Sequence, residues 1–327
     1  MKLADAGELS LLSLLEKRFR KKLPAVVRGI GDDTAVVRNA APESLLTTDM
    51  MIEKVHFDLT WTTPFQVGFK LVSRNVSDIY AMGGTPDFLL INFAGPKDLD
   101  LRFFTRFFDG VAEALRRYRF SLVGGDISRA ERVMVSATVA GHAKKPVCRS
   151  GARPGDTLYV TGPAGDASCG LEIMKRIGRT LELERGRKLR LPVSWECGLP
   201  LVTRHLLPAA RPSGRFAARA SAMIDISDGL AIDLARLCRE SRVGAQVFID
   251  RIPMSAQLRS AADALALDPL ELALCGGDDY EMLFTSSAPK VSGAVPIGTI
   301  VRQGLFLVDD DGKRRKMPCT GYEHFAV

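Results

Sequence analysis

The chain has 327 residues, which at about 150 residues per domain predicts two domains. Hydrophobic residues make up 46% and charged residues 25%, so extended disorder, collagen-like repeats and coiled-coil arrays are excluded for most of the chain. The net charge of +7 fits a nucleic acid, an anionic metabolite or solubility alone, but the basic clusters around 176–190 and 313–316 have no aromatic residues between the charges, which argues against nucleic-acid binding.

The amino-terminal residues predict a helix and not an export signal, because an acid precedes the apolar residues and five of the six basic residues follow them. No apolar run approaches the roughly 20 residues needed to cross a bilayer, so no membrane partner is expected. The six cysteines include no CxxC pair and no nearby histidine, which argues against a zinc site and a dense disulfide framework. A cytoplasmic location is therefore expected.

The first half of the chain predicts an α/β unit. Alternating apolar residues predict strands over 26–37, broken by a turn at 29–33, and two short strands over 45–57 broken at 47–49. Apolar residues spaced three and four apart predict a helix from Pro64 to Gly83, with Thr63 as its cap. A strand over 88–94, a helix over 101–118 and strands over 121–123 and 133–141 complete the unit.

The second half repeats this mixture of helices and strands, so the fold class is mixed α/β (α+β) with two domains. The loop 144–156 carries two prolines and two glycines and predicts the boundary between domains 1–146 and 147–327. Strands are expected over 157–161, 223–226, 246–249 and 280–284, with a hairpin over 295–308; helices are expected over 166–177, 230–238 and parts of 255–274.

Five short acidic segments are predicted to lie at turns, and four of them directly follow apolar runs, which places those four at strand ends. Any one of them alone is commonly just a turn residue or a helix cap. Carboxylates gathered at one sheet edge repel unless cations intervene, and short oxygen ligands suit Mg²⁺ held together with substrate phosphates. The sequence therefore predicts a Mg²⁺-nucleotide site, with a helical aspartate added to the five segments: Gly31-Asp32-Asp33, Thr47-Thr48-Asp49, Gly124-Gly125-Asp126, Asp225-Ile226-Ser227-Asp228-Gly229, Gly276-Gly277-Asp278-Asp279 and Asp78.

The familiar phosphate-binding motifs are absent: the chain has no GxxxxGK[ST], no GxGxxG opening a helix and no kinase HRD or DFG set. If the protein binds a phosphate, metal ions must then supply much of the binding and charge neutralisation. Arg149 is a candidate for bidentate phosphate binding, with a surface ion pair as the alternative. His56 is a candidate site residue, and the alternative is that it is a structural histidine held by hydrogen bonds. The four histidines are too scattered along the chain for a zinc site.

Seven motifs, in order along nearly the whole chain, resemble the thiamine-monophosphate kinase family. Each motif alone is weak, and their order makes the resemblance specific. They are Gly31-Asp32-Asp33-Thr34-Ala35-Val36, Thr47-Thr48-Asp49 with Val55-His56-Phe57, Asn75-Val76-Ser77-Asp78-Ile79, Gly124-Gly125-Asp126, Arg149-Ser150-Gly151, Asp225-Ile226-Ser227-Asp228-Gly229-Leu230 and Gly276-Gly277-Asp278-Asp279-Tyr280-Glu281.

The resemblance implies ATP-dependent phosphorylation of thiamine monophosphate to thiamine diphosphate by a homodimer of two-domain subunits like those of aminoimidazole ribonucleotide synthetase, with a dimerising sheet in the first domain. It implies several Mg²⁺ ions and ATP as co-substrate, and leaves a K⁺ requirement open. No catalytic base is expected. The implied metal ligands are Asp32, Thr47, Thr48, Asp49, Asp78, Asp126, Asp225 and Asp228; the implied ATP contacts are Phe108, Gly125, Asp126, Arg149 and Ser227; the implied thiamine-side contacts are His56, Asp278 and Tyr322.

Several positions depart from the family pattern. Lys54 stands where glycine is usual, Asp278 replaces a glutamate, Phe108 stands where tyrosine is frequent, and Ile127-Ser128 replaces Thr-Thr. None of these removes an implied metal ligand. Phe108 lacks the hydroxyl contact expected near the nucleotide, and the other departures bear on the substrate side and not on the reaction class.

Three classes of rival function are weighed against this one. Selenophosphate synthetase and the hydrogenase-maturation carbamoyl dehydratase of the same superfamily need a reactive cysteine near the amino terminus or at the carboxyl terminus, but the first cysteine here is Cys148 and the chain ends His324-Phe325-Ala326-Val327. A non-catalytic nucleotide-binding homologue would have lost its metal carboxylates, whereas the acidic set is intact. A basic nucleic-acid-binding protein would show retention on DNA that varies with salt.

Overall fold

The computed structural model describes residues 8–19, 26–28, 36–37, 43–318 and 321. Contacts divide the chain into two compact units. Unit 1 takes its described residues from Met1–Ile79, Gly84–Lys144 and Arg179–Arg187, and unit 2 from Tyr80–Gly83, Lys145–Gly178 and Lys188–Val327. Both contain helices and strands, which confirms the predicted mixed α/β class. Within the described residues, no helix is both long enough and apolar enough to cross a membrane.

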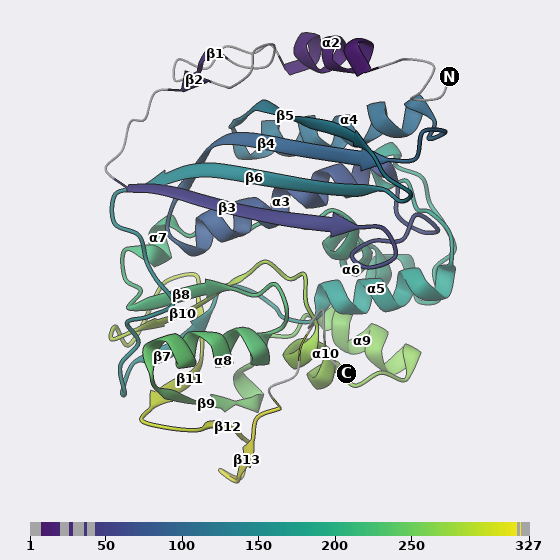
Figure 1. The fold of residues 1–327 in the computed structure, drawn as a ribbon. Coiled ribbons are helices and arrows are strands. Elements are labelled where there is room, and N and C mark those ends of the chain that lie inside the picture. Colours follow the sequence, from purple (N-terminus) through teal and green to yellow (C-terminus); the bar gives the residue numbers. More distant parts are fainter. Residues whose placement is uncertain (1–7, 20–25, 29–35, 38–42, 319–320, 322–327) are drawn as a thin grey trace. The chain divides into compact units, whose positions relative to one another are not determined.

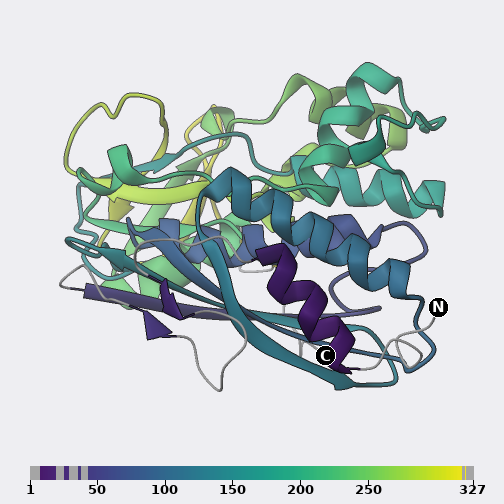
Figure 2. The ribbon, with the colours of Figure 1, turned by 90° about the horizontal axis from the view of Figure 1, so that it is seen from above.

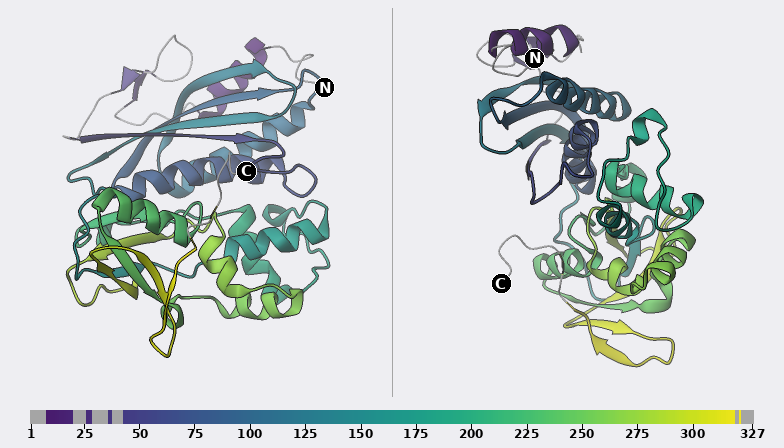
Figure 3. Two further views of the ribbon diagram at one scale, coloured as in Figure 1. Left: turned by 60° about the horizontal axis from the view of Figure 1, so that its bottom comes forward. Right: turned by 90° about the vertical axis from the view of Figure 1, so that its right-hand side faces the viewer.

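Unit 1 is built on a four-stranded sheet with two helices on one face (Figure 1; Figure 3, right). The strand order is β3-β6-β4-β5, antiparallel except for the parallel pair β4 and β5. Burial alternates along β6, so one face of the sheet forms the core and the other is open. The elements are β3 (Glu43–Ile52), β4 (Thr85–Gly95), β5 (Ser121–Arg129), β6 (Met134–Ala143), α3 (Pro64–Ala81) and α4 (Leu101–Tyr118).

Helices α3 and α4 approach each other through two glycines. A Cβ atom on Gly68 would lie 2.1 Å from the carbonyl oxygen of Phe107, and one on Gly110 would lie 1.9 Å from that of Phe65. Larger residues at these positions would push the helices apart, so the pair requires glycine. Under the helices, Phe93 of β4 packs edge-on against Phe104 and Phe107 of α4, with ring centroids 5.2 and 5.4 Å away.

The amino-terminal helix α2 (Glu8–Phe19) lies beside α4, as Figure 2 shows. Phe19 packs edge-on against Phe108 of α4 at 6.0 Å between ring centroids, and Arg18 forms an ion pair with Asp109. This confirms the helix predicted at the amino terminus. Two short strands, β1 (Val26–Arg28) and β2 (Val36–Val37), pair antiparallel.

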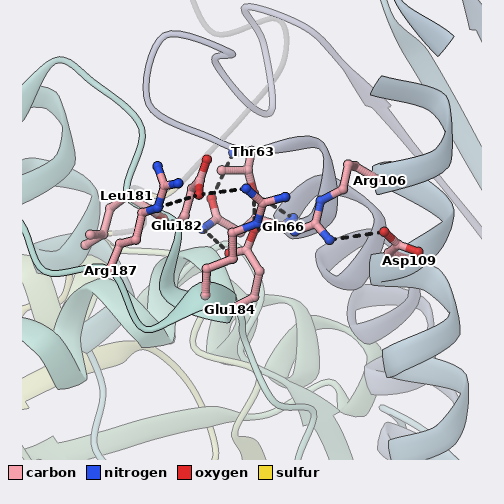
Figure 4. Close-up of polar contacts among 9 residues, drawn as sticks. Thr63, Gln66, Arg106, Asp109, Leu181, Glu182, Glu184 and Arg187 are labelled. Carbon is pink, nitrogen blue, oxygen red and sulfur yellow. Dashed lines mark hydrogen bonds and ion pairs between the residues drawn. The ribbon is translucent and has the colours of Figure 1, made fainter. Parts of the chain in front are cut away.

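Residues 179–187, here called the anchored segment, belong to unit 1 although the chain on both sides of them belongs to unit 2. Figure 4 shows how they attach to α3 and α4. The side-chain amide of Gln66, which is fully buried, donates to the carbonyl oxygen of Leu181 at 2.6 Å. Glu184 accepts hydrogen bonds from Arg106 at 3.0 Å and from Gln66 and Thr63, each at 3.3 Å. These contacts give a role to a stretch for which the sequence predicted none.

Unit 2 is built on a seven-stranded sheet of order β13-β12-β9-β11-β7-β10-β8. Every neighbouring pair is antiparallel except β12 and β9. Figure 3 shows α8 lying along the strands and α5, α6 and α9 gathered as a group. The strands are β7 (Thr157–Val160), β8 (Ala222–Asp225), β9 (Gly244–Phe248), β10 (Met282–Ser286), β11 (Val295–Val301), β12 (Leu305–Val308) and β13 (Arg314–Lys316). The helices are α5 (Asp166–Ile177), η1 (Leu183–Arg185, in the anchored segment), α6 (Trp195–Leu206), α7 (Gly214–Ala217), α8 (Leu230–Ser241), η2 (Ile249–Arg251), α9 (Ala256–Leu265) and α10 (Pro269–Cys275).

Two predictions about strands were wrong. The segments 47–49 and 124–126 do not lie at turns or strand ends, because β3 and β5 run straight through them. Both are edge strands, where polar residues and glycines are tolerated because one side is not paired within the sheet. The predicted hairpin over 295–308 is also absent, because β9 lies between β11 and β12 in the sheet.

Candidate functional site

Thr47, Asp49 and Asp78 form one polar group in unit 1. Thr47 and Asp49 are two residues apart on β3, so their side chains point to the same face, toward α3. The Thr47 hydroxyl donates to Asp78 Oδ2 at 2.6 Å, and Arg74 of α3 lies 3.6 Å from Asp49 Oδ1. Arg74 was not predicted to take part, although its position one helical turn before Asp78 was a usable signal.

Thr48 and Asp126 lie on the opposite face of the same sheet. Thr48 accepts a hydrogen bond from Thr138 at 3.2 Å and donates to the carbonyl oxygen of Ala137 at 3.0 Å. Asp126 is exposed on β5, beside Asn92 in the strand register. Since β6 and β4 separate β3 from β5, at about 4.8 Å per strand, unit 1 by itself does not bring Asp49 and Asp126 together.

The backbone at Gly125 is specific to glycine. Its φ is +151°, and a Cβ atom there would lie 1.8 Å from the carbonyl oxygen of Ile91 on the neighbouring strand. The bulge between β4 and β5 lies next to this position and shifts the register that fixes where Asp126 projects. Phe108 lies elsewhere, 2% exposed, with its ring packed against Phe104 and Phe107. A nucleotide contact by Phe108 stays a prediction.

His56 lies in the turn that follows β3. Its Nδ1 accepts a hydrogen bond from the amide of Ile52 at 3.0 Å, so the neutral imidazole carries its proton on Nε2. Lys54 in the same turn has a φ of +68°, the left-handed region that favours glycine, which matches the glycine expected here from the family pattern. The ammonium of Lys54 donates to Asp58 at 2.8 Å. Burial opposes ionisation of Asp58, but the hydrogen bonds from Lys54 and Thr60 outweigh it and hold its pKa below the ordinary value.

In unit 2, the loop 226–229 connects β8 to α8 and carries Ser227 and Asp228. Asp225, 2% exposed, is the last residue of β8, as predicted for a strand end. The buried carboxylate of Asp233 accepts hydrogen bonds from the loop amides, and Arg236 contacts Asp228 Oδ2 at 2.5 Å. Burial, together with the charge of Asp228, raises the pKa of Asp233 to about 6. Neither Asp233 nor Arg236 was predicted to serve the site.

The loop 276–281 packs against the loop 226–229 by backbone hydrogen bonds. The amide of Asp278 donates to the carbonyl oxygen of Ser227 at 2.8 Å, and the amide of Tyr280 donates to that of Ile226, also at 2.8 Å. This brings Asp278 beside Ser227. Asp278 has a φ of +68°, where aspartate is tolerated better than glutamate, and its carboxylate accepts from the Tyr280 hydroxyl at 2.6 Å. The departure from glutamate therefore matches the local backbone.

Asp279 fixes the loop 276–281 from inside unit 2. It is fully buried, and its two carboxylate oxygens accept from the amides of Gly165 at 2.6 Å and Ala167 at 3.2 Å, at the start of α5. Burial raises the pKa of Asp279 to about 7, against the opposing charge of Arg204. Glu281 accepts from Arg204 at 2.6 Å and from Thr161 at 2.6 Å. Asp279 and Glu281 are thus structural neighbours of Asp278.

Three predicted site residues lie apart from these groups or outside them. Arg149 is exposed. The carbonyl oxygen of the residue before it accepts from the amide of Met223, so Arg149 lies near the start of β8, whereas Ser227 lies in the loop that follows the end of β8. The carbonyl oxygen of Arg149 itself accepts from Ser241 at 2.8 Å. Asp32 and Tyr322 lie outside the described residues.

The donor chemistry of the predicted ligands fits Mg²⁺. Hydroxyl and carboxylate oxygens from Thr47, Asp49 and Asp78 lie on facing elements, and hard oxygen ligands of this kind are what Mg²⁺ prefers. Within the part of the chain that the structure describes, no group of three or more His, Cys, Asp or Glu side chains forms a closed cage. Mg²⁺ needs only one or two carboxylates when substrate phosphates supply further ligands, so an open arrangement suits a metal that arrives with a nucleotide.

Comparison with known protein families identifies both halves of the chain. Residues 31–143 match the family model described as AIR synthase related protein, N-terminal domain. Residues 153–295 match AIR synthase related protein, C-terminal domain. Together the matches cover well over half of the chain and confirm the predicted architecture.

Curated relatives match the chain along its length. The thiamine-monophosphate kinase of Aquifex aeolicus is 36% identical over 331 residues, which cover 99% of this chain and 100% of the relative. The thiamine-monophosphate kinase of Salmonella typhimurium is 36% identical over 344 residues, which cover 98% of this chain and 99% of the relative.

Solved structures agree. AaThiL complexed with AMPPCP and TMP superposes with a TM-score of 0.76 at 35% identity, covering 99% of each chain. The thiamine-monophosphate kinase of Stenotrophomonas maltophilia K279a has a TM-score of 0.80 at 28% identity, covering 93% of this chain and 97% of that one. Hydrogenase maturation protein HypE in complex with ATP, at 17% identity and a TM-score of 0.69, shares the fold. The chain belongs to the thiamine-monophosphate kinase family.

Proposed function

We propose that this chain transfers the terminal phosphoryl group of ATP to thiamine monophosphate and so forms thiamine diphosphate. The observation that carries the proposal is the match over 99% of both chains, at 35% identity, to a protein solved with AMPPCP and TMP. AMPPCP stands in for ATP. A methylene group replaces the oxygen between the β- and γ-phosphates, whose bond to the γ-phosphorus is the one that the reaction breaks.

The residues suit a reaction that needs no general base. The acceptor is a phosphate monoester whose second pKa is about 6, so at pH 7 it is mostly a dianion and already nucleophilic. The obstacle is repulsion between two anions, which positioning and charge neutralisation overcome. Mg²⁺, when bound with the nucleotide, supplies that neutralisation. The lack of a Ser-His or Cys-His pair in the sequence motifs fits this chemistry.

The predicted roles of individual residues remain part of the proposal. Thr47, Asp49 and Asp78 would hold Mg²⁺ from unit 1. The hydrogen bond between Thr47 and Asp78, and the position of Asp49 on the same face of β3 as Thr47, support this. Ser227 would contact the nucleotide and Asp278 the thiamine moiety, and the backbone hydrogen bond between these two residues supports their sharing one site. The further assignments rest on the family motifs: Thr48, Asp126, Asp225 and Asp228 as metal ligands; Phe108, Gly125 and Arg149 at ATP; His56 at thiamine; and Asp32 and Tyr322, outside the described residues.

A homodimer is the second part of the proposal. The open face of the four-stranded sheet carries Leu46, Met50 and Leu90, which are 75%, 50% and 41% exposed. Apolar side chains gathered on one sheet face favour burial against a partner. Asp49 and Asp126 lie on opposite faces and opposite edges of this sheet. A cytoplasmic location stays a prediction of the sequence.

An assay that couples ADP release to NADH oxidation tests the reaction class. The acceptor panel is thiamine monophosphate, thiamine and pyridoxal phosphate, each with ATP and Mg²⁺. We expect turnover with thiamine monophosphate, little with the other two, and loss of turnover in excess chelator. Equal turnover of thiamine would contradict the acceptor assignment. Light scattering at micromolar concentration tests the dimer, and a fully active monomer of 35.6 kDa would contradict it.

A further inference from the structure

One buried carboxylate organises the loop 226–229. Asp233, in the first turn of α8, is 0% exposed, and its Oδ2 accepts hydrogen bonds from three successive amides: Ser227 at 3.0 Å, Asp228 at 3.0 Å and Gly229 at 3.2 Å. Three amides directed at one oxygen define the path of the backbone at all three residues. A carboxylate that accepts several amides makes strong, charge-assisted hydrogen bonds.

This arrangement is not an ordinary helix cap. A cap residue precedes the helix, and its side chain accepts from amides inside the first turn. Here the residue at the cap position is Gly229, which has no side chain to do so. Asp233 lies four positions inside the helix and accepts from amides that come before it. Its contact with the N-cap amide of Gly229 resembles half of a capping box, whereas its hydrogen bonds to Ser227 and Asp228 serve the loop alone.

Arg236 links this carboxylate to Asp228. Its Nη1 lies 2.5 Å from Asp228 Oδ2 and 2.7 Å from the second oxygen, Oδ1, of Asp233. One guanidinium thus lies between two carboxylates that would otherwise repel, and it holds the Asp228 side chain in a defined direction. Asp233 uses one oxygen for the backbone of the loop and the other for the arginine that orients its side chain.

The loop 276–281 depends on the same support. The carbonyl oxygens of Ile226 and Ser227 accept from the amides of Tyr280 and Asp278, each at 2.8 Å. A displacement of Ser227 would therefore move Asp278 as well. Asp233 thus fixes the amides of the loop 226–229, and the carbonyl oxygens of that loop fix the loop 276–281.

We propose that Asp233, assisted by Arg236, is the positioning residue of the nucleotide side of this site: it sets the backbone that directs Ser227 toward the phosphates of ATP and Asp228 toward the accompanying Mg²⁺. This inference rests on the proposed function. Asp233 does not touch the ligand, because its two oxygens are engaged by the loop amides and by Arg236. Residues that orient metal and phosphate ligands in this way typically change affinity or activity 10- to 100-fold when they are replaced.

Two variants and a matched control test the proposal. Asp233→Ala removes both interactions. Asp233→Asn keeps one oxygen for the three amides but turns an NH₂ group toward Arg236, so it retains the loop contacts and loses the arginine contact. Asp100→Ala is the control, because Asp100 accepts from one amide, that of Arg102 at 2.8 Å, at the start of α4 in unit 1. It removes an aspartate that stabilises a helix end without touching either loop.

The first measurement is hydrogen exchange of the amides of residues 227–229 in the full chain, followed by mass spectrometry. We expect these amides to be protected in the wild type and in Asp233→Asn and to exchange at least about tenfold faster in Asp233→Ala. The second is calorimetric titration with AMPPCP and Mg²⁺. We expect the affinity to fall by about tenfold or more in Asp233→Ala, by less than about threefold in Asp233→Asn, and not in Asp100→Ala.

Each outcome decides between separate claims. Wild-type affinity for AMPPCP in Asp233→Ala, with fast exchange of the three amides, would overturn the positioning role. Equal loss of affinity in Asp100→Ala would reduce the effect to general destabilisation and also overturn it. If Asp233→Ala does not fold, Asp233→Asn decides, because unprotected loop amides in that folded variant would refute the assigned contacts. Failure of the wild type itself to bind AMPPCP with Mg²⁺ would instead contradict the proposed function.

Discussion

Replacing Glu184 should release the anchored segment from α3 and α4. The Glu184 carboxylate is 8% exposed and accepts from Arg106 at 3.0 Å and from Gln66 and Thr63, each at 3.3 Å. Loss of the hydrogen bond from the charged Arg106 costs about 1.5–3 kcal/mol, and loss of the longer ones from the neutral donors Gln66 and Thr63 to the same carboxylate adds about 0.5 kcal/mol. Arg106 keeps Asp109 as a partner at 3.1 Å and is itself 30% exposed, so the lower part of this range applies.

We therefore expect Glu184→Ala to favour the open form of the segment by about 2 kcal/mol, or roughly 30-fold in its population. Trypsin reports this directly, because Arg185 and Arg187 lie in the segment. When opening is fast relative to cleavage, the cleavage rate follows the open population, so cleavage at these two sites should rise by about the same factor. Mass spectrometry of the early fragments identifies the sites.

Glu182→Ala is the control within the same segment. Glu182 contacts Arg187 at 3.2 Å and Arg185 at 3.4 Å, both inside the segment and both largely exposed, so its loss should change the rate by less than about threefold. Equal acceleration by the two variants would contradict this prediction, because the segment would then not be held through Glu184. No acceleration in Glu184→Ala would refute it as well.

Three further predictions follow from the two units. Burial raises the folded pKa of Asp279 from 3.8 to about 7, so its contribution to stability is present below pH 4 and is lost, by up to about 4 kcal/mol, as pH rises toward 7. The free energy of unfolding of Asp279→Asn, measured in urea between pH 4 and 8, should therefore lack this loss. The same dependence of the free energy of unfolding on pH in the variant and the wild type would contradict the prediction. Asp278→Ala should raise KM for thiamine monophosphate with little change for ATP, and steady-state kinetics that weakened ATP alone would move this residue to the nucleotide side. Asp49→Asn and Asp126→Asn should each lower turnover at least about 100-fold while the ligand-free Tm stays the same or rises, since like charges are removed; a large drop in Tm for both would favour a purely structural role.

Local sequence patterns predicted most of the helices. The spacing of apolar residues placed α3 and α4 close to their observed bounds, and Thr63-Pro64 marked the start of α3. Helix α6 (Trp195–Leu206) was missed because Pro200 lies inside it and a charged stretch precedes it, two signals that normally argue against a helix. The periodic spacing of a helix involves residues close together in the chain, so it can be recognised in a single sequence.

Strand pairing was less predictable because it depends on residues far apart in the chain. Nothing local to 295–308 indicates that β9 separates β11 from β12. Thr47 to Asp49 and Gly124 to Asp126 looked like turns because threonine, glycine and aspartate are frequent there, but edge strands accept the same residues. Side-chain identity alone did not separate these two environments.

The family motifs predicted which residues to examine, and the structure added what supports them. Asp233 lies five residues after Asp228, and its only sequence signal is an aspartate in the first turn of a helix, a place where acidic residues are common for another reason. That it serves the preceding loop follows only from the backbone path. Arg74 beside Asp49 is similar, because that contact joins a strand to a helix.

The most direct test of the proposed function is to follow the phosphoryl group itself. ATP labelled with ³²P at the γ-phosphate is incubated with the full chain, Mg²⁺ and thiamine monophosphate, and the products are separated by chromatography. We expect the label to appear in thiamine diphosphate at the rate of ADP formation, and neither product to form when thiamine monophosphate is omitted. Label released as inorganic phosphate, or transferred to unphosphorylated thiamine as readily as to thiamine monophosphate, would contradict it.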